Sequence, residues 1–79
     1  MEFCEPQKNI LQMGLKEGMR VADIGAGSGH WALAAAPVVG EDGRVYAIDI
    51  QEDVLKGLKR EAVERGLANI VTVWGDVER

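Results

Sequence analysis

The sequence predicts an α/β fold: half of a Rossmann-like three-layer unit, with three parallel strands in the order 3-2-1 flanked by helices. Three short apolar runs rich in β-branched residues, at 19–24, 45–49 and 70–74, have the length and composition of buried strands. An alanine-rich stretch at 31–36 and an amphipathic stretch at 52–65 separate them, and helices are expected there. Strands that alternate with helices indicate βαβ units, and right-handed crossovers give the stated strand order.

The turn after the first predicted strand is a glycine-rich motif. The chain from 20 to 29 reads Arg-Val-Ala-Asp-Ile-Gly-Ala-Gly-Ser-Gly. Glycine is needed where the backbone adopts a positive φ and where a bound molecule approaches it closely. A dinucleotide-binding fingerprint, G-x-G-x-x-G, would place its third glycine at position 30, which is His30. Here the third glycine, Gly29, comes one residue early, which favours a different ligand.

Local signals set the remaining elements. A short N-terminal helix is predicted over 5–14, where a proline lies in the first turn and a glycine follows the last. Ser28 is expected to cap the helix after the glycine turn. That helix is expected to weaken near Pro37, because proline lacks a backbone donor. Gly66 is expected to end the amphipathic helix.

Each predicted strand ends near an acidic residue. Asp23 lies two residues before the first glycine of the motif, Asp49 closes the second strand, and Asp76 follows the third. Ligands of open parallel sheets bind outside the carboxyl ends of the strands, so the three carboxylates are expected at one edge. A carboxylate offers only acceptors, whereas the two hydroxyls of a ribose offer two donors. Asp49 is therefore a candidate for binding a ribose diol.

The glycine motif and the three acids together resemble the cofactor-binding motifs of the class I S-adenosylmethionine-dependent methyltransferases. The resemblance covers nearly all of 15–78. It implies a single truncated cofactor-binding half-domain over 1–79, with the N-terminal helix at 5–14 and a βαβαβ core at 19–78. The implied ligand is S-adenosylmethionine or its demethylated product, S-adenosylhomocysteine.

The resemblance also implies a role for each matched residue. Asp49 would hold the ribose hydroxyls, Asp76 would meet the adenine amino group, and Ile50 would pack on the adenine. The glycine loop would lie under the methionine part, while Asp23 shapes the loop and faces the ammonium group, directly or through water. The predicted cofactor-binding residues are Asp23, Gly25, Ala26, Gly27, Ser28, Gly29, Asp49, Ile50, Asp76 and Val77, the last through its backbone.

Simpler structural roles stay open for the same acids. Asp49 could cap the following helix, Asp76 could be a turn aspartate, and Asp23 could bond only the loop backbone. No catalytic or metal-binding residue is predicted, because a lone histidine without other ligands at metal-binding spacing is not a metal site. Trp74 is expected mainly to pack, although an approach to the adenine edge stays open.

Length, composition and charge limit the class of protein. The chain has 79 residues, enough for one small domain, and its 47% hydrophobic and 28% charged residues are typical of soluble proteins. No apolar run approaches the ~20 residues needed to span a bilayer, and the first residues show no signal-peptide pattern, so neither is expected. The net charge of −4 argues against a nucleic-acid surface. A single cysteine, Cys4, suits a reducing compartment, so a cytoplasmic location is expected.

The chain stops soon after the third predicted strand, so the half that holds a methyl acceptor is expected to be missing. Methyl transfer depends on holding an acceptor in line with the methyl group, so we expect no efficient catalysis by this chain alone. In the order 3-2-1 the first strand becomes an edge with unpaired backbone groups. We therefore predict a homodimer, through that edge or by a swap, since small domains are often stabilised by oligomerisation.

Three alternative functions stay open. The chain could be one subunit of a split methyltransferase, a structural module without affinity for cofactor, or a dinucleotide-binding Rossmann fragment. His30 at the third-glycine position and Asp23 argue against the dinucleotide. No residue indicates which molecule accepts the methyl group.

Overall fold

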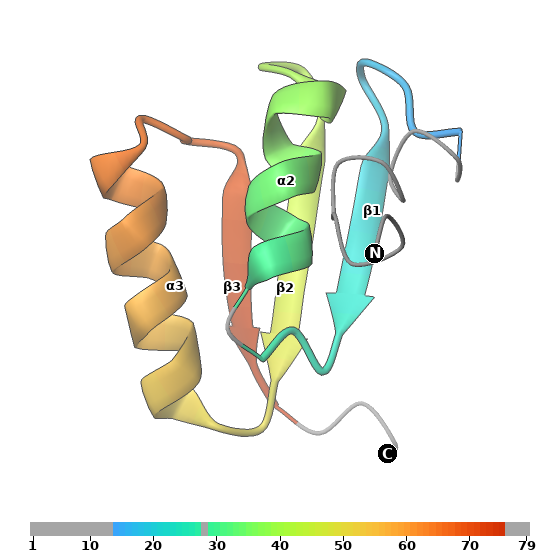
Figure 1. Ribbon diagram of the computed structural model, residues 1–79. Coiled ribbons are helices and arrows are strands. Elements are labelled where there is room, and N and C mark those ends of the chain that lie inside the picture. The colour runs from blue at the N-terminus through green and yellow to red at the C-terminus, as the bar shows by residue number, and fades with distance from the viewer. Residues whose placement is uncertain (1–13, 28, 76–79) are drawn as a thin grey trace, which may run out of the picture.

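A three-stranded parallel sheet forms the frame of the protein (Figure 1). In the computed structural model, which describes residues 14–27 and 29–75, the strands are β1 (Arg20–Ile24), β2 (Arg44–Asp49) and β3 (Ile70–Trp74). β2 lies in the middle and pairs with both neighbours. The predicted strands and the order 3-2-1 are confirmed.

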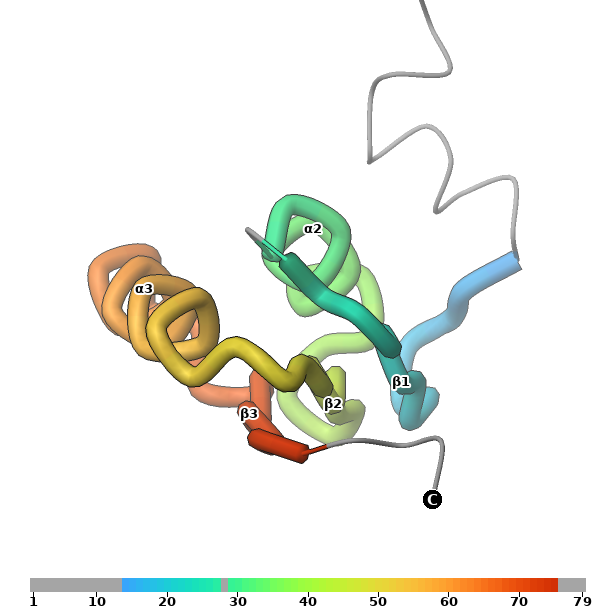
Figure 2. Tube along the Cα trace, turned by 90° about the horizontal axis from the view of Figure 1, so that it is seen from below, coloured from blue at the N-terminus to red at the C-terminus, as the bar shows by residue number. Residues whose placement is uncertain are grey.

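Two helices cover one face of this sheet (Figures 1 and 2). They are α2 (His30–Val39), which packs mainly on β2, and α3 (Glu52–Glu64), which packs on β3 and β2. The helix predicted over 5–14 lies outside the described residues, apart from its final glycine. Among the elements that the structure describes, both helices therefore lie on the same side of the sheet.

The core lies between the two helices and the sheet. α3 is amphipathic and buries only its inward stripe, Leu55, Leu58 and Ala62. α2 is apolar on most sides because it lies over the central strand, where Val45 and Ala47 are fully buried. The buried core residues are Ala32, Leu33, Ala35, Ala36, Val39, Val45, Ala47, Leu55, Leu58 and Ala62.

The two ends of α2 differ from the local predictions. Gly29, with φ +82°, is the N-cap residue, so the prediction that Ser28 caps the helix is wrong. The helix also continues through Pro37 to Val39. It tolerates the proline because little more than half a turn follows it, and the amide of Gly40 still bonds the carbonyl oxygen of Ala36 at 3.1 Å.

The face of the sheet away from the helices is apolar beyond a pair of arginines at its start. Side chains alternate along each strand, so Arg20 and Arg44 begin this face, and the six residues beyond them are Ala22 and Ile24 of β1, Tyr46 and Ile48 of β2, and Val71 and Val73 of β3. Ile24 is 65% exposed, and the two valines are 39% exposed. We call these six residues the open face.

Candidate functional site

The carboxyl ends of the three strands meet at one edge of the molecule, the lower edge in Figure 1. Both helices begin at this edge, and the glycine loop, residues 25–29, crosses it from β1 to α2 (Figure 2). In open parallel sheets this edge is where ligands bind. The residues gathered there form the candidate functional site.

Glycine is required at the three positions of the loop for different structural reasons. Gly25, Gly27 and Gly29 all adopt positive φ, at +72°, +58° and +82°. A Cβ on Gly29 would collide with the side chain of Leu58 on α3, so this glycine lets the start of α2 pack closely on the neighbouring helix. A Cβ on Gly25 would meet no heavy atom within 4 Å. The first part of the loop therefore leaves its backbone open to an approaching molecule.

The loop is bonded to the end of the central strand. The amides of Gly25 and Ala26 both donate to the carbonyl oxygen of Ile48, at 2.7 and 3.0 Å. The amide of Gly29 bonds back to the carbonyl oxygen of Ala26 at 3.0 Å. These bonds attach the start of the loop to the end of β2 and join Ala26 to Gly29.

Asp49 completes this arrangement with its side chain. Its Oδ2 accepts a hydrogen bond from the amide of Gly27 at 2.9 Å, and its Oδ1 accepts one from the amide of Gln51 at 2.8 Å. The Gln51 and Gly27 amides hold the pKa of the Asp49 carboxyl below its usual value. Gln51 is the N-cap residue of α3, so Asp49 bonds that position without being the cap itself. An ionised carboxylate therefore joins the glycine loop to the loop after β2.

Asp23 lies on the same face of the sheet in the adjacent strand. Burial, and to a smaller extent the charge of Asp49, raise the pKa of its carboxyl group. Its Oδ2 is buried, and no group in the described part of the chain donates a hydrogen bond to it. A buried acceptor without a donor is unfavourable, so the site has capacity for a cation or a hydrogen-bond donor.

The structure therefore brings several predicted site residues together. Asp23, Asp49 and the glycine loop share one end of the sheet, and Ile50, directly after Asp49, is 65% exposed there. Ser28, Asp76 and Val77 lie outside the described residues, so their roles stay predictions.

Two features of the site could not be specified from the sequence. The Gly27–Asp49 bond joins residues far apart in the chain. The other feature is Trp74, whose indole Nε1 donates to the carbonyl oxygen of Ile50 at 2.9 Å. The only signal for Trp74 in the sequence is its position as the last apolar residue of the third strand.

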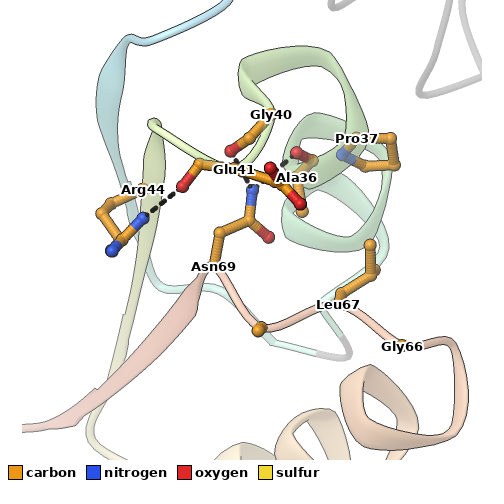
Figure 3. A pocket seen from close by; sticks show the side chains of 9 residues that line it. Ala36, Pro37, Gly40, Glu41, Arg44, Gly66, Leu67 and Asn69 are labelled. Carbon is orange, nitrogen blue, oxygen red and sulfur yellow. Dashed lines mark hydrogen bonds between the residues drawn. The ribbon is translucent and has the colours of Figure 1, made fainter.

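A cavity of about 440 Å³ lies at the other end of the sheet, where β2 and β3 begin (Figure 3). Asn69 is buried there, and its side-chain amide donates to the carbonyl oxygens of Ala36 and Gly40 at 2.7 and 2.9 Å. This amide joins the end of α2 to the start of β3. Its Oδ1 is buried and has no hydrogen-bond partner within the described residues, and the cavity lies away from the glycine loop.

The fold and the site together define the class of protein. A parallel sheet with a glycine loop before its first crossover helix, and an acid at the end of the second strand, is a Rossmann-like arrangement. A family model described as "Methyltransferase domain" matches residues 15–79. The chain belongs to this family and has its class I Rossmann-like fold.

Individual relatives agree with this assignment. The demethylmenaquinone methyltransferase of Geobacillus kaustophilus (strain HTA426) is 35% identical over 67 residues, which are 85% of this chain and 29% of that protein. A SAM-dependent methyltransferase from Aquifex aeolicus has a TM-score of 0.83 and 38% identity, over 91% of this chain and 38% of that one.

A more distant structure shows the fold alone. Coclaurine N-methyltransferase, bound to N-methylheliamine and SAH, has a TM-score of 0.88 at 22% identity, over 99% of this chain and 23% of its own. The chain thus spans less than two fifths of the length of each of these three proteins. Neither helix in residues 14–27 and 29–75 has the length and apolar character that a membrane span requires.

Proposed function

We propose that this chain binds S-adenosylmethionine or S-adenosylhomocysteine at the glycine loop and supplies one half of a methyltransferase cofactor site. The observation that carries the proposal is the position of Asp49. Each oxygen of its carboxylate accepts one backbone amide, from Gly27 or Gln51, and each carboxylate oxygen has a further acceptor position. A ribose diol offers two donors, so the carboxylate can bind it while it keeps the loop in place.

The remaining residues fit the charge and shape of such a cofactor. S-adenosylmethionine carries a sulfonium and an ammonium group, and Asp23 presents a buried acceptor that no described residue donates to. The open space over Gly25 admits a chain of atoms close to the backbone. These features support a cationic nucleoside ligand.

The same proposal includes a limit on catalysis. The chain spans 29% of the demethylmenaquinone methyltransferase and 38% of the Aquifex aeolicus enzyme. We therefore infer that methyl transfer needs residues beyond these 79, on a longer chain or on a second polypeptide, to hold the acceptor. A split methyltransferase is the second candidate, and methyl transfer that appears only when a partner polypeptide is added would favour it.

Self-association is part of the proposal. Among the described strands β1 lies at an edge of the sheet, and the open face beside it is apolar. A second copy that pairs along β1 would extend the sheet and cover part of this surface. A cytoplasmic location remains a prediction from the sequence.

Calorimetric titration with S-adenosylhomocysteine tests the cofactor site. Asp49→Asn should weaken binding about tenfold or more, because an amide oxygen cannot replace a carboxylate that bonds two amides and a diol. Asp42→Asn is the matched control: it makes the same change of charge at an exposed turn and should bind like the parent chain.

Each result of the titration has a defined meaning. No binding of S-adenosylhomocysteine at millimolar concentration contradicts the proposed function and favours a structural module. Binding of NAD in its place would favour the dinucleotide alternative. Equal weakening by both substitutions would assign the effect to net charge rather than to the Asp49 carboxylate.

A further inference from the structure

The cavity at the amino end of the sheet has no part in the proposed cofactor site. Its volume of about 440 Å³ is within the range of small-molecule pockets. The C-terminal end of α2, the turn that follows it and the segment before β3 line the cavity (Figure 3). The glycine loop lies at the opposite end of the strands, so a molecule bound in this cavity would not contact the loop.

The cavity has a buried hydrogen-bond acceptor in its lining. Asn69 is 7% exposed, and its Nδ2 donates to the carbonyl oxygens of Ala36 and Gly40. These bonds fix the orientation of the side-chain amide, because the two carbonyl oxygens can only accept. Oδ1 is thereby left on the side of Leu67 (Figure 3), and no described residue donates to it. A buried acceptor without a donor is unfavourable, so a ligand that donates there gains a hydrogen bond.

The charges around the cavity favour a donor that is positively charged. The cavity lies at the C-terminal end of α2, where the helix dipole favours cations. The exposed Glu41 contributes a carboxylate to the lining. Arg44 also lines the cavity, but its Nη1 donates to the carbonyl oxygens of Glu41 and Gly43, at 2.9 and 2.6 Å. The guanidinium is therefore directed to the backbone of the turn, across the Glu41 backbone from Leu67 (Figure 3).

The remaining lining is mostly apolar and suits a hydrocarbon group. Pro37 of α2 and Leu67 of the segment before β3 contribute the larger side chains. Because Oδ1 of Asn69 is enclosed, binding must include a small shift of residues 66–68. Gly66 and Ala68, on either side of Leu67, are exposed, so this segment can shift with little loss of packing.

We propose that this cavity is a second binding site, which takes a small primary ammonium ion with an apolar body. An N–H group of the ligand donates to Oδ1 of Asn69, and the positive charge lies near the Glu41 carboxylate. The hydrocarbon part packs on Pro37 and Leu67. The site is independent of the proposed function, because its lining shares no residue with the glycine loop.

A pair of probes tests the need for a donor. Phenethylammonium is the ligand, and its N,N,N-trimethyl derivative is the control, since it keeps the charge and the ring but has no N–H group. In a nuclear magnetic resonance titration of the full chain, phenethylammonium should shift the amide signals of residues 66–69 and saturate at millimolar concentration. The amide signals of the glycine loop should stay in place. The trimethyl derivative should bind about tenfold more weakly, because it leaves Oδ1 without a donor.

A pair of substitutions tests the charge. Glu41→Gln should weaken phenethylammonium about threefold, the effect of one exposed ion pair. Glu64→Gln makes the same change on an exposed residue of α3 that does not line the cavity, and it should bind like the parent chain. Thermal unfolding verifies that both variants are folded at the titration temperature.

The opposite results would overturn the proposal. Equal binding of the two probes would remove the donor from the explanation, and equal weakening by both substitutions would assign the effect to net charge. Shifts confined to the glycine loop and Asp23 would assign the ammonium ion to the cofactor site instead. The absence of any shift would mean that the cavity binds no amine. Each of these results leaves the proposed function standing, because the titration with S-adenosylhomocysteine decides that separately.

Discussion

The single residue Asp23 lowers the stability of the fold, although it belongs to the candidate site. Its carboxyl group is part-buried, lacks a donor for one oxygen within the described residues, and faces the charge of Asp49. Each of these features disfavours the ionised form in the folded state relative to the unfolded chain. A residue selected only for stability would not be acidic here, which is consistent with a role in ligand binding.

Asp23→Asn should therefore raise the melting temperature at pH 7. The pKa of Asp23 is raised on folding, so the stability it contributes is complete below its unfolded pKa and is lost as pH rises through the folded value. The advantage of the asparagine variant should shrink as pH falls toward ~3, below the ordinary aspartate pKa. Thermal unfolding from pH 3 to 7 measures this difference.

The exposed Asp42→Asn variant controls for the loss of one negative charge. It should differ little from the parent chain, because Asp42 lies in a solvent-exposed turn. An advantage of Asp23→Asn that stays constant with pH, or a parent chain that is more stable at pH 7, would contradict the assignment.

The residues of the site were predictable from the sequence to the extent that their roles are local. Glycines that need positive φ and acids at strand ends leave signals within a few positions. The contacts of Asp49 with Gly27 and of Trp74 with Ile50 depend on strand register, which fixes both partners only after the sheet forms. No local signal carries that information.

Glycine stabilises the fold at the start of α2 but destabilises it inside α3, so replacing each glycine with alanine gives a matched pair of substitutions. Gly29→Ala should destabilise the fold by about 2–5 kcal/mol, since it combines a positive φ with a collision against Leu58. Gly57→Ala, inside α3 with open space at its Cβ, should stabilise by about 0.5–1 kcal/mol.

Urea denaturation of both variants measures the two effects. Leu58→Ala added to Gly29→Ala should cost less than the sum of the single changes, because it removes the collision. A Gly29→Ala variant as stable as the parent chain would contradict the close approach of Gly29 to Leu58.

For a whole element such as α2, single residues in the sequence do not predict where the helix begins and ends. A serine beside a glycine predicts a side-chain cap, yet the chain begins its helix from Gly29, because only glycine fits both the backbone angle and the space next to α3. Pro37 lies late enough in the helix that its missing donor affects one bond near the end. Tertiary packing decides both positions, whereas the strands and α3 follow their hydrophobic periodicity.

The molecule as a whole combines an apolar open face with an edge strand. The amide of Arg44 bonds the carbonyl oxygen of Met19, and the amide of Gly25 bonds that of Ile48. Because backbone groups alternate in direction along a strand, the amide and carbonyl of Ala22 point away from β2. No described strand pairs with β1 on that side, so a second copy can add its own β1 there in antiparallel orientation.

This geometry predicts a dimer that one backbone change disrupts. Ala22→Pro removes the outward amide of β1 and leaves the bonds to β2, so it should shift a dimer to monomer in light scattering at micromolar concentration. Thr72→Pro makes the same change on the outer side of β3, since β3 bonds β2 through the carbonyl of Asn69 and the amide of Gly75. The Thr72 variant should stay dimeric, provided that circular dichroism shows both variants folded. A parent chain that is monomeric at this concentration, or equal dissociation by both prolines, would rule out pairing through β1.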